Sequence, residues 1–279
     1  MDGIKYFAIA GDADAPTVTL DKSVYPGCIF VSAEWFTETL EDLGISRRDS
    51  DELFILVGSD MDNSGSLNAE LELQIENDVL TLTNTCAVFV PGGAARGNFR
   101  VKRLDKPVLC VTCHLNSDTY ESAPAEPTAQ VGKYANNFVE GYVPPSGVMP
   151  AAPEGFLDLL LYLDGVRLAG APYMEIMWFK TPNDTGPAPH EHDDFDEFIG
   201  FLGTDPEHPG ELGATVEFYI GDEAVTVTKS SLVYIPRGVR HSPIIVPEMS
   251  RPIIHFSGGN GGDYARRGET GRDGNTFRF

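Results

Sequence analysis

The chain repeats itself. When its 279 residues are shifted by 145, the stretch from about Ser46 to Thr112 aligns without a gap on residues 191–257. About a quarter of the aligned positions are identical, which favours a duplicated unit over chance. The identical pairs include Glu52 with Glu197, Asp60 with Asp205, Glu72 with Glu217, Pro91 with Pro236 and Gly93 with Gly238. The sequence therefore predicts two similar domains.

Each copy consists of short apolar segments that are separated by turns. The segments EFIGFLG, ATVEFYI and RPIIHFS of the second copy, and ELFILVG, AELELQI and KPVLCVTC of the first, are rich in residues that favour strands. Gly, Pro and Asp stand between them, as is typical of turns. Helical spacing is confined to two short stretches, around Glu34–Leu43 and around Phe156–Leu163. This pattern predicts two all-β barrels or sandwiches.

The segment between the copies defines the expected domain limits. Ser117–Pro153 is rich in Pro, Ala, Gly and Ser, as a connection would be. We place the boundary near residue 130, with a first domain over 1–130 and a second over 131–262. Residues 263–279 form a Gly/Arg-rich end, for which a flexible tail is the favoured interpretation.

Composition excludes several classes of partner. The formal net charge of −22 argues against a nucleic-acid ligand. No apolar stretch approaches the roughly 18 residues of a membrane span, and the first residues lack the pattern of an export signal. All four cysteines lie in the first half of the chain and do not suggest a disulfide framework that joins both units. We therefore expect a cytoplasmic protein with reduced thiols and no membrane or nucleic-acid partner.

Candidate metal ligands occur in the second copy. His190 and His192 are two residues apart, so on a strand both imidazoles would point to the same face. Glu197 follows a polar turn, and the Pro236-x-Gly238 turn precedes His241. Three imidazoles and a carboxylate suit a divalent transition metal such as iron, manganese, nickel, zinc or cobalt, with one or two positions left open. We predict that these four residues bind such a metal.

The same residues carry a family resemblance. His190-Glu-His192 with Glu197, followed by Pro236-x-Gly238-x-x-His241, resembles the two motifs of the cupin superfamily. The resemblance covers most of the chain and implies a bicupin, with two tandem double-stranded β-helix barrels of the jelly-roll type. The glycines that flank the first family motif fit poorly here, which we interpret as loop variation.

The first copy lacks the ligand set. The 145-residue shift places Ile45, Arg47, Glu52 and Arg96 at the four ligand positions. Arginine keeps its positive charge and cannot ligate a cation, so we expect no metal there. Glu52, Arg47 and Arg96 could pair with each other in an apolar pocket, which we favour, or bind a small anion.

Several functions follow from the resemblance. Cupins imply metal-dependent dioxygenases, decarboxylases, isomerases and lyases that act on small oxygenated molecules, and we favour dioxygenase-type oxidoreductase chemistry. The alternative is a non-catalytic bicupin that binds a metal or a small ligand. His255, on the last strand of the second copy, is a candidate hydrogen-bond donor or proton carrier next to the metal. If the chain forms an oligomer, we expect a homodimer built on exposed strand edges.

Overall fold

The computed structural model describes residues 3–12, 14, 17–41, 44–144, 155–184 and 186–261. These residues form strands and two short 3-10 turns, η1 (Gly3–Tyr6) and η2 (Met61–Asn63), with no α-helix among them. No helix in the described part of the chain is long and apolar enough to cross a membrane. The expected tail over 263–279 lies outside the described residues.

The first barrel consists of two facing sheets. One sheet has the strand order β13-β8-β5-β11-β3-β2. The other has the order β10-β6-β9-β4-β12, with β7 also paired to β6. The bounds are β2 (Thr17–Leu20), β3 (Phe30–Phe36), β4 (Ile45–Arg47), β5 (Glu52–Gly58), β6 (Ser66–Ile75), β7 (Asp78–Asn84), β8 (Cys86–Val90), β9 (Ala95–Gly97), β10 (Arg100–Leu104), β11 (Val108–His114), β12 (Ala123–Pro124) and β13 (Phe138–Glu140).

The second barrel has the same plan. Its larger sheet has the order β1-β19-β16-β21-β15-β14, and it faces the three-stranded sheet β18-β17-β20. The bounds are β1 (Phe7–Ile9), β14 (Leu157–Leu163), β15 (Met174–Phe179), β16 (Glu197–Leu202), β17 (Glu211–Ile220), β18 (Glu223–Lys229), β19 (Ser231–Ile235), β20 (His241–Met249) and β21 (Ile253–Gly259).

Strand pairing reproduces the duplication residue by residue. Glu52 on β5 lies opposite His114 on β11, and Glu197 on β16 lies opposite Gly259 on β21, so both members of the pair are displaced by 145. The β6–β7 and β17–β18 hairpins obey the same shift. The expected all-β architecture of two tandem barrels is therefore confirmed.

Each large sheet takes its edge strand from outside its own repeat. β1, near the start of the chain, pairs with β19 of the second barrel. β13, which follows residue 130, pairs with β8 of the first barrel. Strand pairing thus crosses the expected boundary near residue 130 in both directions, and each barrel is completed by a segment that the repeat does not contain.

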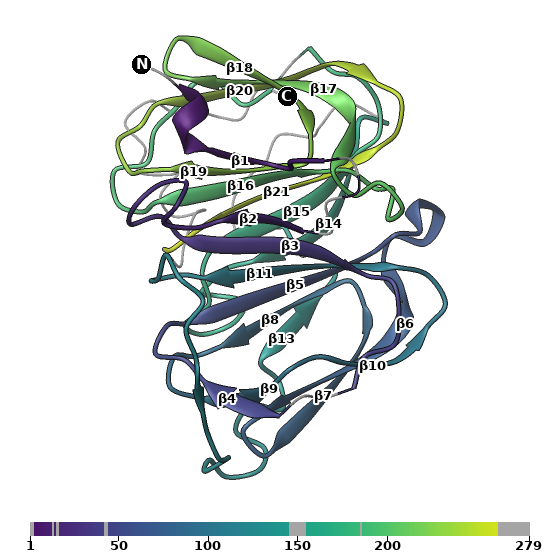
Figure 1. The fold of residues 1–279 in the computed structure, drawn as a ribbon, viewed down its shortest axis with the longest axis vertical. Helices are drawn as coiled ribbons and strands as arrows, with labels where there is room; N and C mark the ends of the chain where they lie inside the picture. The colour runs from purple at the N-terminus through teal and green to yellow at the C-terminus, as the bar shows by residue number, and fades with distance from the viewer. Residues whose placement is uncertain are drawn as a thin grey trace.

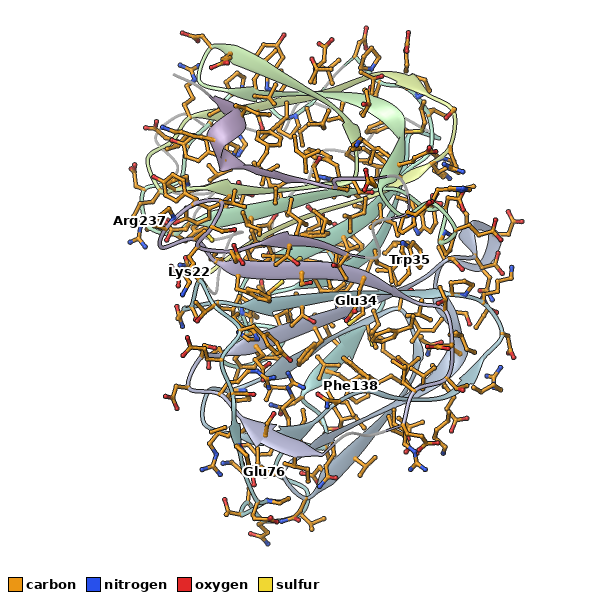
Figure 2. All side chains as sticks on the ribbon, viewed as in Figure 1. Lys22, Glu34, Trp35, Glu76, Phe138 and Arg237 are labelled. Atoms are coloured by element: carbon orange, nitrogen blue, oxygen red, sulfur yellow. The ribbon has the colours of Figure 1, made fainter. Side chains whose placement is uncertain are left out.

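The two large sheets pack against each other, face to face, in the middle of the molecule (Figure 1). One apolar cluster joins Val31, Ile55 and Val111 of the first barrel to Trp178 and Phe256 of the second. Trp35 packs against this cluster, and its label in Figure 2 lies at the level where the barrels meet. Strands of these sheets are consequently buried on both faces, which explains their continuous apolar segments.

Each barrel also has its own apolar interior. Alternate residues of the large-sheet strands point inward, for example Phe54 and Leu56 in the first barrel and Ile199 and Phe201 in the second. The polar inward positions are exceptions within this pattern, and they form the candidate site.

Neither expected helical stretch is a helix in the described part of the chain. The first begins in β3 and continues as a loop up to residue 41, and the second coincides with β14. Both segments are apolar over a few residues only, and such a short run does not distinguish a strand from a helix by spacing alone. β3 pairs with β11, and β14 pairs with β15. This pairing favours the strand conformation, because it provides hydrogen-bond partners for the backbone amide and carbonyl groups of β3 and β14.

Candidate metal centre

Backbone hydrogen bonds hold the two histidines of the first motif beside the second motif. The amide of His190 donates to the carbonyl of His241 at 3.0 Å, and the amide of His241 donates back at 2.9 Å. The carbonyl of His192 accepts from the amide of Gly238 at 2.7 Å. Gly238 has a φ of 75°, which glycine adopts without strain in the turn before His241. The turn sequence thus places the third imidazole beside the first two.

The four predicted ligands converge. Donor atoms of His190, His192 and His241 lie within 4.8 Å of one another, in an arrangement that could hold a metal ion. Oε2 of Glu197 lies 2.9 Å from Nε2 of His241 and 3.5 Å from Nε2 of His192. Glu197 and His241 are 4% and 1% exposed. The structure therefore brings all four side chains to one place inside the second barrel.

Hydrogen bonds at Nδ1 orient two of the rings. Nδ1 of His190 lies 2.8 Å from the carbonyl of Ala188, and Nδ1 of His241 lies 3.0 Å from the carbonyl of Val239. Because a carbonyl oxygen can only accept, Nδ1 carries the hydrogen in both rings. When each imidazole is neutral, Nε2 keeps its lone pair for a ligand, as is usual for metal-binding histidines.

The electrostatics fit a cation. Burial opposes the charge on Glu197, but the neighbouring imidazoles hold its pKa well below the usual range. Burial likewise opposes protonation of His241, and Glu197 outweighs it and raises the pKa. Burial and the charge of His241 lower the pKa of His190 to about 4. Oε2 of Glu197 and Nε2 of His241 are buried with no hydrogen-bond partner among the described residues, although they face each other. A cation between them would satisfy both atoms.

A small cavity adjoins three of the four side chains. It has a volume of about 50 Å³ and is lined by His190, Glu197 and His241. Apolar side chains such as Met177 and Phe179 form other parts of its wall. By the space that one water molecule needs, this volume holds about four water-sized groups. The site can therefore accept a small molecule beside a bound ion.

His255 points into the same cavity. Its Nδ1 lies 3.0 Å from the carbonyl of Gly200, and its ring stacks between Phe179 and Phe201. Burial lowers its pKa to about 4, which keeps the imidazole neutral, with Nε2 as a hydrogen-bond acceptor. The structure thus places this residue where the sequence analysis expected it, although its role stays a prediction.

Sequence reasoning missed the buried acid of the cavity. Glu175 on β15 is 6% exposed and lines the cavity together with Ser257, which lies opposite it on β21. The sequence feature that could have identified it is a single acid in the apolar segment MEIMWF. Glu175 is two and four residues from the inward-facing Met177 and Phe179, so on a strand it points to the same side as they do. Burial raises its pKa to about 7.

The equivalent position of the first barrel holds an ion-pair network. Nη2 of Arg96 lies 2.8 Å from Oε1 of Glu52, and Nε lies 3.0 Å from Oε2. His114 and Arg48 approach the same carboxylate at 3.2 and 3.4 Å. Burial opposes the charge on Glu52, but His114 and Arg96 lower its pKa to about 2. The favoured ion-pair interpretation is confirmed for Glu52 and Arg96.

Arg47 is a correction to that prediction. The alignment placed it in the pocket, but the buried partner of Glu52 is the next residue, Arg48. Arg47 lies on the short strand β4, which pairs with β9, and it is only half-buried. Ser46 faces Arg96 across this pairing. Strand parity sends neighbouring side chains to opposite faces, so a shift of one residue changes which arginine enters the pocket.

The two barrels fill the space beside the conserved glutamate in opposite ways. In the first barrel, His114 lies opposite Glu52, and residue 50 is a small serine. In the second barrel, Gly259 lies opposite Glu197, and Phe195 takes the space that a Cβ of Gly259 would need, at 2.3 Å. Phe195 stacks on the ring of His192 at 4.3 Å. In the second barrel, Phe195 thus packs against the candidate ligand His192. In the first barrel, His114 contacts Glu52 instead.

Comparison with known proteins extends the description of the fold. No protein-family model and no curated protein matches the sequence. A variant of the oxalate decarboxylase OxdC of Bacillus subtilis has a similar structure, with a TM-score of 0.58 over 89% of this chain and 74% of that chain, at 7% identity. AerE from Microcystis aeruginosa matches with a TM-score of 0.53 over 91% of this chain and 98% of that chain, at 14% identity.

These similarities concern the fold, because the sequences are so different. Both matches extend over nearly all of this chain and include both barrels. Together with the residue-by-residue duplication of the strands, they show that the chain has the fold of the cupin superfamily.

Proposed function

We propose that the second barrel is a metal-dependent enzyme site that acts on a small oxygenated molecule. The observation that carries this proposal is the convergence of three imidazoles and one carboxylate beside a cavity. His190, His192, Glu197 and His241 would hold a divalent transition metal. Four protein donors leave positions for a substrate on a five- or six-coordinate ion. When bound, the metal would act as a Lewis acid toward a substrate oxygen.

Manganese is the first metal to test. One of the similar oxalate decarboxylase structures comes from work on the Mn(II) centres of that enzyme. A set of imidazoles with one carboxylate also suits iron, nickel, zinc and cobalt, so the donor set leaves the choice among them open.

We favour a reaction that moves a proton, isomerisation or decarboxylation, over the dioxygenase chemistry that the sequence analysis favoured. The support is the cavity wall, which carries a buried acid, Glu175, and a neutral imidazole, His255. Such groups serve as a proton donor or acceptor for a bound substrate. A dioxygenase is the second candidate, because the apolar residues Met177, Phe179 and Ile199 in the wall would accommodate dioxygen.

Elemental analysis and an oxygen electrode test the proposal. Purified protein should carry close to one divalent metal per chain. The metal-loaded protein should then convert a member of a panel of small keto and dicarboxylic acids, catechols and β-diketones without oxygen uptake. Oxygen uptake that matches product formation would favour the dioxygenase. A chain that binds no divalent metal would contradict the proposal.

A further inference from the structure

Glu175 differs from the other buried carboxylates of the described structure. Glu52 pairs with Arg96, and Glu197 lies against His241. The remaining three, Glu76, Asp78 and Asp164, accept hydrogen bonds from backbone amides. Oε1 of Glu175 is buried, and no described residue donates a hydrogen bond to it. A buried carboxyl oxygen without a hydrogen-bond partner costs free energy, so Oε1 of Glu175 calls for an explanation.

Its position suggests that explanation. Glu175 lines the same cavity as His190, Glu197 and His241, and no lysine or arginine among the described residues lines that cavity. β21 lies between β15, which carries Glu175, and β16, which carries Glu197. As a lining residue, Glu175 can contact a molecule in the cavity. It is separated from the candidate ligand Glu197 by the width of one strand, β21.

The first barrel supports a link between this acid and the ligand set. Ser32 lies opposite Thr112 on β11, just as Glu175 lies opposite Ser257 on β21. The barrel in which arginine replaces the third histidine thus has a hydroxyl where the second barrel has a carboxyl group. The acid is present in the copy that has the candidate metal ligands.

We propose that Glu175 is a catalytic residue of this site, the base that removes a proton from the carbon beside the carbonyl group of a small oxo acid. This role rests on the proposed function, because the metal would hold the substrate in the cavity. Burial raises the pKa of Glu175 to about 7, so both its acid and base forms are populated at neutral pH.

The step is balanced without an added oxidant or reductant. The carboxylate takes the proton, the C–H bond breaks, and its electron pair forms the C=C bond of an enolate while the carbonyl π pair moves to oxygen. Return of the proton from the carboxylic acid restores the carbonyl group. Return to the same carbon exchanges hydrogen with solvent, and return to another carbon of a conjugated substrate gives an isomer.

The size of the cavity limits the substrate. A volume of about 50 Å³ has room for about four water-sized groups. An oxo acid with a few heavy atoms is of this size. Pyruvate is such a molecule, and its methyl protons report directly on proton removal beside a carbonyl group.

Hydrogen exchange of pyruvate provides the test. The manganese-loaded chain is incubated with pyruvate in D2O, and proton NMR follows the loss of the methyl signal. We expect the wild-type protein to catalyse this exchange and Glu175→Gln to lower the rate at least about 100-fold, the usual scale of general-base catalysis. Glu175→Asp, which keeps the carboxyl group, should retain part of the activity.

Two further measurements separate the role of Glu175 from the integrity of the site. Manganese bound per chain should be the same in Glu175→Gln as in the wild type. The infrared band of a protonated carboxylic acid, present in the wild type near neutral pH, should be reduced in Glu175→Gln. Asp158→Asn is the matched control. It removes a partly exposed carboxylate that pairs with Lys180, the residue after β15, and it should change neither the bound manganese nor the infrared band.

The outcomes are distinguishable. Bound manganese with equal exchange rates in the wild type and in Glu175→Gln would overturn the catalytic role and leave the proposed metal site standing. Bound manganese without exchange in the wild type would also overturn the role. Failure of the wild type to bind manganese or another divalent metal would overturn the proposed function, and this inference with it.

Discussion

Glu52 and Glu197 occupy the same position in the two barrels and have different partners. Glu52 contacts two guanidinium groups and one imidazole, whereas Glu197 lies against the imidazoles of His192 and His241. Guanidinium groups bring their own positive charge, and neutral imidazoles leave room for a cation. Both barrels have a glutamate at this position, and its partners decide whether it forms a structural ion pair or part of a candidate metal site.

The ligand role of His241 can be tested by removal of its side chain. His241→Ala should lower the metal bound per chain at least about 10-fold, since it removes one of four donors. Circular dichroism should stay close to that of the wild type, because the substitution leaves the backbone bonds to His190 in place. Arg96→His is the comparison, and it should create no second metal site, because residue 45 is an isoleucine. Unchanged metal content in His241→Ala would contradict the ligand set.

The buried pair of the first barrel predicts a dependence of stability on pH. The pKa of Glu52 is lowered from 4.5 to about 2, so the unfolded chain binds more protons between these values. The stabilisation is therefore present above about pH 4.5 and is lost as the pH falls toward 2, with a magnitude of roughly 3 kcal/mol.

Urea unfolding of the wild type and Glu52→Gln, followed by circular dichroism, measures this contribution. Glu52→Gln should be less stable at pH 7 by roughly 3 kcal/mol, because the charge of Arg96 stays buried without its partner. The difference between the two proteins should shrink as the pH falls toward 2. A difference that stays constant over this range would mean that Glu52 does not contribute through its charge.

At the scale of elements, the edge strands join distant parts of the chain. β1 contributes Phe7 to the edge of the large sheet of the second barrel, and Tyr6 of η1 packs in the same core. Both side chains are buried, and burial of such a ring contributes about 1.5–3 kcal/mol. The start of the chain is therefore part of the barrel that carries the candidate metal site.

Removal of residues 1–10 should destabilise the second barrel by about 3 kcal/mol or more. Thermal unfolding in the presence and absence of manganese measures the effect. Phe7→Ala should reproduce part of the loss, whereas Ile9→Ala, at a residue that is 41% exposed, should be close to neutral. If the truncated chain unfolds at the wild-type temperature, β1 does not support the barrel.

The elements differ in how far the sequence predicts them. The repeat and the apolar segments predict strands β5, β6 and β11 of the first barrel and β16, β17 and β21 of the second, because local pattern and duplication agree there. β1 and β13 were not predicted, since their partners lie far away in the sequence and no local pattern specifies such pairing. In the site, motif spacing predicted the four converging residues, whereas Glu175 and Arg48 depend on strand register, which a single sequence leaves open.

At the scale of the whole molecule, the two barrels share one apolar interface. Trp178 lies in the cluster between the large sheets and Trp35 packs against it, and these are the two tryptophans of the chain. A large apolar contact couples the stability of the parts that form it. We therefore expect the barrels to unfold together.

Tryptophan fluorescence and far-ultraviolet circular dichroism can test this coupling in one urea titration. Fluorescence reports on the interface, and circular dichroism reports on all strands. The two transitions should coincide, with a common midpoint. A fluorescence transition that precedes the loss of strands would indicate barrels that separate before they unfold. A homodimer stays a prediction, for which light scattering of the folded chain gives the mass.

Both proposals depend on one metal ion that His190, His192, Glu197 and His241 share in the second barrel. Anomalous diffraction from crystals of the protein grown with manganese tests it most directly. We expect one anomalous peak per chain, within coordination distance of all four side chains, and no peak between Glu52 and Arg96. The absence of a peak among the four residues, or a peak elsewhere, would contradict it.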